Sequence, residues 1–264
     1  MNMSLSRADQ LALGYAAVTA GAAGVFGISA LTLGLPTVAF FALLTDGIAR
    51  PASGVLYPTA THGPRNGNRV ALSFDDGPDP AVTPAVLDAL AAQGARASFF
   101  VIGQRLSAQP AIARRIVDEG HELGNHSWQH SRWQNFWGVA ALEDEIRRGE
   151  QAIAAITGSA SRPWYRSPIG LKSPPLARAA KLQDIRICAW SLHARDTAAA
   201  SAAQIADRVL GKVRAGDIIL MHDGHDLPGR TRPACAAAVA LILGGLKARG
   251  LESVTVSELL GGRA

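Results

Sequence analysis

Cysteine is scarce in this sequence, with only Cys188 and Cys235 among 264 residues. Both lie in apolar or alanine-rich runs, so we expect small core residues rather than a disulfide framework or a zinc knuckle. Dense basic clusters are missing too, because the lysines and arginines behind the net charge of +5 are scattered and do not alternate with aromatic residues. This distribution argues against a nucleic-acid partner. No glycine-rich phosphate-binding loop supports a phosphoester hydrolase.

Charge is missing altogether from Gln10 to Thr45, a run of 36 residues without Asp, Glu, Lys or Arg. One helix of this length would measure roughly 54 Å, whereas the hydrocarbon core of a bilayer is ~30 Å thick. The run therefore predicts one membrane span with a surplus apolar turn, or a hairpin of two short spans broken at Gly34-Leu35-Pro36. A buried hairpin in a soluble protein is the alternative. A cleaved signal peptide is disfavoured, because its apolar core would be only ~7–15 residues long.

Basic residues bias the orientation of this segment. Arg7 before it is offset by Asp9, whereas three arginines follow it without an acid between residues 46 and 75, namely Arg50, Arg65 and Arg69. The positive-inside rule thus favours a cytoplasmic catalytic side, which a hairpin satisfies; a single span with its N-terminus inside would place the domain on the outer face. We predict a protein anchored in a bacterial-type inner membrane, with an anchor over 1–49, a linker rich in Pro and Gly over 50–69 and a catalytic domain over 70–264.

Strand-like and helical patterns alternate along the rest of the chain. Strands are expected near 70–74, 96–102, 121–125, 162–166, 185–190, 216–221 and 252–255. Helices are expected near 83–93, 109–118, 138–157, 174–182, 202–214, 232–249 and 256–260. This alternation predicts an α/β fold with parallel strands and crossover helices. Seven units favour a distorted (β/α)7-type barrel, in which the chemistry lies at the carboxyl ends of the strands.

The first candidate site is the doublet Asp75-Asp76, which follows the apolar run 70–74 and precedes the turn Gly77-Pro78. Two adjacent carboxylates repel each other unless a cation or solvent offsets the repulsion. Alone, the doublet fits an ordinary Asp-rich turn better than a cation site. The other ligands of a cation have to come from elsewhere in the chain.

His126 and His130 are candidates for those ligands. Two histidines four residues apart lie on one face if the backbone is helical, and both imidazoles can then reach one metal ion. The pair alone fits a solvated polar turn equally well. Together with Asp76 it offers two nitrogens and one carboxylate oxygen, and three protein ligands with an open fourth position are typical of catalytic zinc. His121, at the start of a strand, is not expected to be a ligand.

Three further strand ends carry titratable side chains, which are Arg166, Asp196 and His222. An arginine there could pair with Asp75 and hold it ionised. Each residue taken singly is more typical of a surface or structural position. Successive strand ends that carry Asp-Asp, His-x-x-x-His, Arg, Asp and His are not a pattern that structure alone demands.

With these motifs, residues 68–260 resemble the polysaccharide deacetylases, the NodB-type carbohydrate esterases. Ser73–Pro78 is similar to the first motif of that family and His126–His130 to the second, and the two are highly specific in combination. Arg166–Pro168 and Leu220–His222 match the third and fifth motifs more loosely. The resemblance implies a distorted (β/α) barrel and hydrolysis of an N-acetyl, sometimes O-acetyl, group on a sugar. It also implies a divalent metal, usually Zn²⁺, with Co²⁺, Ni²⁺ or Mn²⁺ as alternatives.

The resemblance also implies the roles of five site residues. Asp76, His126 and His130 would bind the metal, which polarises the amide carbonyl and lowers the pKa of its water toward ~7. Asp75 would be the general base, and it can stay ionised because the metal neutralises its neighbour. His222 would protonate the leaving amine as general acid.

The remaining roles concern the shape of the site. Arg166 would orient Asp75, and a backbone N–H at Ile169 would help to hold the oxyanion. Leu220 would line the pocket for the acetyl methyl group, and Trp190 would contact the substrate.

Several positions depart from the family pattern. Ile169 replaces an aromatic residue, and in the fourth motif His193 replaces the first Asp and Thr197 the closing Trp, so that only Asp196 matches. Asp196 is expected to tune His222 in place of the missing Asp. The loss of two groove aromatics argues against a standard chitin-like polymer groove. Four nearby aromatics could form a sugar platform, dock on the membrane or simply pack: Trp128, Trp133, Phe136 and Trp137.

These observations predict a membrane-anchored, metal-dependent deacetylase. Its substrate would be an N-acylated amino sugar of a polysaccharide, an oligosaccharide or a lipid-linked glycan. The altered fourth motif motivates an alternative, a carbohydrate-binding pseudoenzyme that keeps the metal site but has lost turnover. No sequence feature specifies an oligomeric state.

Overall fold

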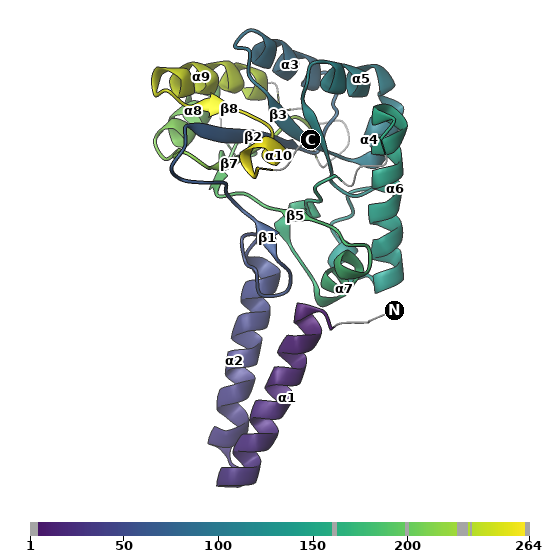
Figure 1. The fold of residues 1–264 in the computed structure, drawn as a ribbon, viewed down its shortest axis with the longest axis vertical. Helices are drawn as coiled ribbons and strands as arrows, with labels where there is room; N and C mark the ends of the chain where they lie inside the picture. The colour runs from purple at the N-terminus through teal and green to yellow at the C-terminus, as the bar shows by residue number, and fades with distance from the viewer. Residues whose placement is uncertain (1–4, 160–162, 199–200, 226–231, 233, 262–264) are drawn as a thin grey trace.

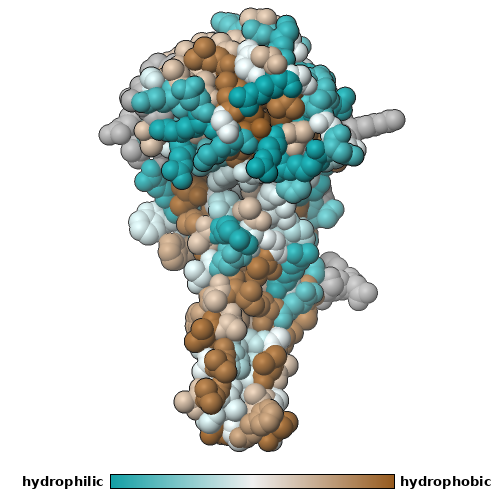
Figure 2. All heavy atoms as spheres, turned by 90° about the vertical axis from the view of Figure 1, so that its left-hand side faces the viewer, coloured by the Kyte–Doolittle hydropathy of each residue, from teal (hydrophilic) through white to brown (hydrophobic). Residues whose placement is uncertain are grey.

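A computed structural model describes residues 5–159, 163–198, 201–225, 232 and 234–261 of the chain. It consists of a helical hairpin that projects from an α/β domain (Figure 1). The hairpin is formed by α1 (Arg7–Phe26) and α2 (Ala30–Ala49), which pack side by side. Its far half is covered by hydrophobic side chains, whereas the domain surface is largely hydrophilic (Figure 2).

The hairpin turns at residues 27–29, so the predicted break at Gly34-Leu35-Pro36 is wrong. Gly27 takes a left-handed φ of 77°, and the Ser29 side chain accepts a hydrogen bond from the Thr32 backbone N–H, which starts α2. Pro36 lies inside this helix. Such a proline is tolerated in apolar helices. A helix cap and a left-handed glycine thus set the turn more strongly than the proline does.

Among the described residues, one helix, Ala30–Ala49, is long and apolar enough to cross a membrane. Only 6% of its apolar window is buried in the protein, so it is not a core helix. A signal sequence near the N-terminus would meet the same criteria.

A parallel sheet forms the centre of the domain, in the order β4-β3-β2-β7-β6. Its strands are β2 (Arg69–Asp75), β3 (Ala97–Val101), β4 (Glu122–Asn125), β6 (Leu192–His193) and β7 (Ile218–His222). The short β8 (Glu252–Ser253) pairs with the start of β2. The central strands are almost continuously apolar and buried because helices cover them. The predicted α/β class is therefore confirmed.

Helices follow most of the strands, as the sequence predicts. The longer ones are α3 (Thr83–Ala91), α5 (Pro110–Asp118), α6 (Val139–Thr157), α7 (Pro174–Leu182), α8 (Ala202–Leu210) and α9 (Ala234–Ala248). Shorter ones are α4 (Gly103–Ala108), α10 (Val256–Leu259) and the 3₁₀ turns η1 (Gln134–Phe136) and η2 (Pro168–Gly170). The main core lies between β2, β3 and β7 and the helices α3, α5, α8 and α9.

The two edges of the sheet are joined through one stretch of chain. β5 (Ile187–Cys188) pairs with β1 (Thr59–Ala60), and Tyr165 bridges Asn125 on one side and Ile187 on the other. Five residues later the same stretch forms β6 on the opposite edge, beside β7. The strand predicted over 185–190 is shorter than expected, since it contains only β5, and β6 follows beyond its end. The predicted linker over 50–69 contributes β1 to the domain. The distorted (β/α)7-type barrel stays a prediction, because the described ladders form separate six- and two-stranded sheets.

Hydrogen bonds from Arg166 accompany the end of β5 at Cys188. The buried guanidinium of Arg166 donates hydrogen bonds to the carbonyls of Cys188, at 3.4 Å, and Ala189, at 3.1 Å. Those carbonyls therefore accept hydrogen bonds from a side chain and not from a neighbouring strand. Such an interruption depends on a residue about twenty positions away, so local sequence patterns do not reveal it.

Candidate metal and active site

Asp76, His126 and His130 come together at the carboxyl ends of β2 and β4, all three buried. One potential ligand atom from each lies within 4.8 Å of the others. The Oδ1 atom of Asp76 is 3.2 Å from Nε2 of His130 and 3.6 Å from Nε2 of His126. Ligands at the usual 2.0–2.1 Å from a tetrahedral zinc ion would be about 3.3 Å apart. The donor types and these two separations therefore make the cluster a possible site for a divalent metal ion.

Four residues around this cluster hold left-handed backbone conformations that are uncommon for side chains other than glycine. They are Asp76 (φ 73°), Ser127 (φ 68°), His130 (φ 56°) and Ile169 (φ 51°). Hydrogen bonds fix the second loop, since Ser127 N–H donates to Asn125 Oδ1 and His130 N–H donates to Ser127 Oγ. Such strain is typical of functional sites, where the surrounding structure over-determines the backbone.

The orientation of His126 is set by the strand beside it. Its Nδ1 lies 2.8 Å from the backbone carbonyl of Arg166, so Nδ1–H donates there and Nε2 is left to act as a ligand. On the other side of the site, Arg105 donates to the carbonyls of Asp76 and His225, each at 2.6 Å. Arg105, on α4, was not singled out in the sequence because α4 itself was not predicted.

Asp75 forms a buried ion pair with Arg166, as expected. The Nη1 atom of Arg166 donates to Asp75 Oδ1 at 2.6 Å and to Ser73 Oγ at 3.0 Å, and only 1% of the arginine is exposed. Its guanidinium also stacks on Phe100, 3.8 Å from the ring centre. The second oxygen of Asp75, Oδ2, faces His126 Nε2 at 3.7 Å. One oxygen is thus held by a cation while the other is turned toward the ligand cluster.

His222 and Asp196 form the second ion pair of the site. Asp75 and His222 are register partners on β2 and β7, which places the histidine beside the carboxylate pair. Asp196 Oδ1 lies 3.0 Å from Nδ1 of His222, and Oδ2 accepts the His222 backbone N–H at 2.7 Å. Burial lowers the pKa of His222, but the carboxylates of Asp196, Asp76 and Asp75 together raise it by more, so the net shift is upward. The pair therefore favours a protonated imidazole.

A pocket of about 560 Å³ opens over these groups. Three predicted substrate residues line it: Ile169, Leu220 and Trp190. Ile169 is 47% exposed and Leu220 is buried on β7. His193 also lines the pocket, with its ring centre 5.8 Å from that of His222. Its Nδ1 accepts the Arg195 backbone N–H at 2.9 Å.

Asp223 is a further acid that the sequence analysis did not consider. It is completely buried behind the doublet and accepts a hydrogen bond from Thr83 Oγ1 at 2.6 Å. Burial raises the pKa of Asp223 to about 7. Gly77 makes room for it, since a Cβ atom there would lie 2.3 Å from an Asp223 oxygen. Its place directly after His222 was the only available signal.

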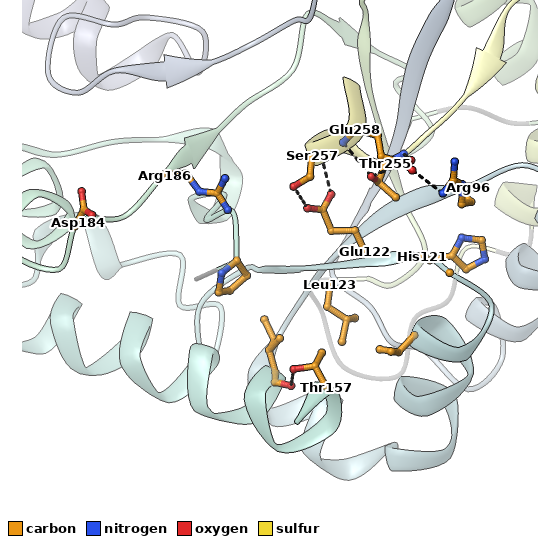
Figure 3. A pocket seen from close by; sticks show the side chains of 14 residues that line it. Arg96, His121, Glu122, Leu123, Thr157, Asp184, Arg186, Thr255, Ser257 and Glu258 are labelled. Carbon is orange, nitrogen blue, oxygen red and sulfur yellow. Dashed lines mark hydrogen bonds and ion pairs between the residues drawn. The ribbon is translucent and has the colours of Figure 1, made fainter. Parts of the chain in front are cut away.

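A second pocket, of about 400 Å³, lies at the other end of β4 (Figure 3). There Glu122 accepts hydrogen bonds from Ser98 and Ser257, and Arg96 pairs with Glu258 at 2.5 Å. His121 lines this pocket, and burial lowers its pKa to about 4. It lies outside the ligand cluster, in keeping with the expectation that it is not a ligand.

An α/β fold with an Asp-His-His cluster, an aspartate–arginine pair and an aspartate–histidine pair at its strand ends defines a hydrolase with a candidate metal site. The polysaccharide deacetylase family matches residues 62–188 of the chain. A peptidoglycan-N-acetylglucosamine deacetylase of Bacillus cereus is 36% identical over 205 residues, covering 75% of this chain and 90% of its own. A chitooligosaccharide deacetylase of Bradyrhizobium is 34% identical over 210 residues, which cover 75% of this chain and 94% of that protein.

Solved structures agree with these relatives. A peptidoglycan N-acetylglucosamine deacetylase in complex with 4-naphthalen-1-yl-N-oxidanyl-benzamide superposes with a TM-score of 0.72 at 31% identity, over 78% of this chain and 94% of that one. A family 4 carbohydrate esterase from Streptomyces lividans in complex with acetate superposes with a TM-score of 0.62 at 33% identity, over 72% of this chain and 93% of that one. The chain belongs to the polysaccharide deacetylase family. The predicted family is thus confirmed, and with it the enzyme class, carbohydrate deacetylase.

Proposed function

We propose that this protein is a metal-dependent hydrolase that removes an N-acetyl, or similar acyl, group from an amino sugar of a glycan. The arrangement of Asp75 supports this most directly. One oxygen is held by Arg166 at 2.6 Å while the other faces the Asp76–His126–His130 cluster. A carboxylate fixed in this way is suited to accept a proton from water beside the cluster.

The cluster is proposed to hold Zn²⁺, with Co²⁺, Ni²⁺ or Mn²⁺ as alternatives. A bound cation would polarise the acyl carbonyl and acidify a water molecule. Burial works against the ionised form of Asp76, but the imidazoles of His126 and His130 hold its pKa well below the usual range, so it is a carboxylate ligand at neutral pH.

The other residues would transfer protons and bind the acyl group. Asp75 takes a proton from water, whose oxygen forms a bond to the acyl carbon. His222, kept protonated by Asp196, gives its proton to the amide nitrogen as the carbon–nitrogen bond breaks. The products are a free amine and a carboxylic acid, which then loses its proton to the solvent. The backbone N–H of Ile169 would stabilise the developing oxyanion. Leu220 and Trp190 would form the wall around the acyl group and the sugar.

We further propose that the hairpin anchors the protein in the inner membrane of a bacterium, with the catalytic domain on the cytoplasmic side. A hairpin returns both ends to one face, and the arginines after α2 favour the cytoplasm. A carbohydrate-binding protein without turnover is the second candidate, because His193 stands where the family has an Asp. The contact between Asp196 and His222 argues against it.

The test is an acetate-release assay on N-acetylated glycans with the full chain in detergent and added zinc or cobalt. Asp75→Asn should keep the metal but lose turnover by about 10²–10⁴-fold. His126→Ala should lose both metal and turnover. Asp88→Asn, an exposed acid on α3, is the matched control and should change neither. Full activity of Asp75→Asn would contradict the assignment of the base, and metal binding without acetate release by the wild type would favour the second candidate.

A further inference from the structure

Two large aromatic side chains project from the segment that follows the metal-binding histidines. Trp133 is 71% exposed and Phe136 is 82% exposed, and their ring centres are 5.9 Å apart. Two neighbours behave differently: Trp128 lies under the guanidinium of Arg148, and Trp137 packs against the cluster around Tyr165. Paired exposed aromatics are typical of an interaction surface. We call Trp133 and Phe136 the aromatic pair.

The aromatic pair is tied to the wall of the substrate pocket. Arg132, the residue before it, lines the pocket. Gln134, inside η1, is completely buried and donates to Tyr165 OH at 3.3 Å and to Ser167 Oγ at 3.4 Å. Ser167 leads directly into η2, whose Ile169 lines the pocket. Gln134 thereby holds the pair at a fixed position beside the pocket.

The same wall rests on the end of the hairpin. Lys172 donates from its backbone N–H to the carbonyl of Ile48 in α2 at 3.2 Å, and from Nζ to the carbonyl of Pro51 at 2.9 Å. At Gly170 a Cβ atom would lie 2.8 Å from Pro51 on one side and 2.7 Å from Trp190 on the other. A single layer of residues therefore separates the pocket from the chain that leaves α2.

This contact fixes the height of the pocket above the membrane. The uncharged run ends at Thr45 and α2 ends at Ala49, so Pro51 lies about 9 Å further along the chain at a helical rise of 1.5 Å per residue, and about 13 Å further if residues 50 and 51 are extended. The headgroup layer on each side of the hydrocarbon core is about 5–8 Å thick. The wall of the pocket consequently lies at the outer edge of the headgroup layer when the apolar part of the hairpin is in the bilayer.

Charged groups mark this boundary around the hairpin. Arg50 is exposed at the end of α2, where it pairs with Asp46. Arg178 of α7 pairs with Asp9, and Lys181 donates to the carbonyl of Leu5. Hydrophilic side chains gather where the hairpin meets the domain, whereas hydrophobic ones cover its far half (Figure 2). Basic side chains at this level suit a layer of anionic lipid headgroups.

We propose that the pocket takes its amino sugar from a lipid-linked glycan at the membrane surface, with the aromatic pair inserted into the headgroup layer beside it. This inference rests on the proposed deacetylase function and names its substrate class. Trp and Phe rings at the boundary between water and lipid stabilise such docking. A pocket at the outer edge of the headgroup layer meets the first sugars of a lipid-linked glycan, whereas a wall polymer would have to reach down to the lipid surface.

The test compares two substrates for the full chain in vesicles of phosphatidylethanolamine and phosphatidylglycerol. One is polyprenyl-phosphate-linked N-acetylglucosamine in the same vesicles, and the other is soluble triacetylchitotriose. The double variant Trp133→Ser/Phe136→Ser should lose about ten-fold or more in kcat/KM on the lipid-linked substrate. It should lose far less on the soluble one. Leu241→Ser, an exposed leucine on α9, is the matched control and should change neither.

Quenching of tryptophan fluorescence by brominated lipids provides an independent measurement. Trp133→Phe should abolish most of the lipid-dependent quenching, whereas Trp164→Phe should retain it, because the Trp164 indole N–H donates to Ser257 beside the second pocket. Unchanged quenching in Trp133→Phe, or equal losses on both substrates in the double variant, would overturn the inference. A wild type active only on triacetylchitotriose would overturn it while leaving the proposed function intact. A wild type active on neither substrate would refute the proposed function itself.

Discussion

Replacing Asp196 with Asn tests the proposal that this carboxylate keeps His222, the proposed general acid, protonated. Asp196 is buried and accepts two hydrogen bonds from His222, one from the ring at 3.0 Å and one from the backbone at 2.7 Å. Asparagine keeps the size and one acceptor but removes the charge. The backbone contact can therefore persist while the stabilisation of the imidazolium is lost.

The magnitude follows from that one contact. A hydrogen bond to a charged group contributes about 1.5–3 kcal/mol, and each 1.4 kcal/mol corresponds to a factor of about ten. We therefore expect kcat/KM to fall by about 10–100-fold at and above neutral pH. Burial lowers the pKa of His222 and Asp196 raises it, so the substitution must lower it. Because the protonated form is the acid, the alkaline limb of the pH profile should move to lower pH, and activity should be retained best on the acid side.

The assay is acetate release from triacetylchitotriose across the pH range, with Asp207→Asn on the surface of α8 as the matched control. In a double-mutant cycle, Asp196→Asn should have almost no further effect once His222 is alanine, because the two residues act as a unit. A uniform loss with an unmoved alkaline limb would refute the reasoning. Additive losses in the cycle would do the same.

Three further predictions concern stability, each measured by urea unfolding of the full chain. Leu87→Ala should lower the free energy of unfolding by about 2–5 kcal/mol because it leaves a cavity in the main core. Leu241→Ala, on the exposed face of α9, should lower it by less than about 0.5 kcal/mol. Equal effects of the two substitutions would contradict the described core. Arg166→Met should lower the free energy of unfolding by about 3–5 kcal/mol because it leaves the Asp75 carboxylate buried without its cation. Adding Asp75→Asn should recover part of this loss of stability. No recovery would show that the guanidinium stabilises the fold through its other contacts. The pKa of Asp223 is raised to about 7 in the folded protein, against ~3.9 when unfolded. The contribution of the protonated Asp223 to stability is therefore fully present below the lower pKa and is lost as pH rises through the upper one. Asp223→Asn should gain stability relative to wild type between these two pKa values, and parallel curves of stability against pH would exclude the raised pKa.

Much of the site could be read from the sequence because its residues follow apolar runs at the ends of parallel strands. The doublet Asp75-Asp76 and the pair His126 and His130 carry their own spacing, so the ligand set needed only the rule that such ends meet at one edge of a sheet. Helix boundaries were also accessible, since proline, serine and threonine at helix starts are local signals. The family motifs then supplied the roles that spacing alone left open.

Contacts between distant segments decided the rest. The stretch 185–190 is apolar and reads as one strand, yet only Ile187–Cys188 forms a strand within it. Arg166 donates hydrogen bonds to the carbonyls of Cys188 and Ala189 there, and only the fold shows where that guanidinium points. The hairpin turns at Gly27 rather than at Pro36, because side-chain capping and helix packing outweigh a proline that an apolar helix can accommodate. The sequence by itself determined which residues are the candidates to hold a cation and to move protons, because the spacing of the motifs is local and their resemblance to the family supplied the proposed roles. Only the tertiary structure decided that Asp196 meets His222 and that the pocket rests on the end of the hairpin, because hydrogen-bond pairing and packing are satisfied between segments far apart in the chain.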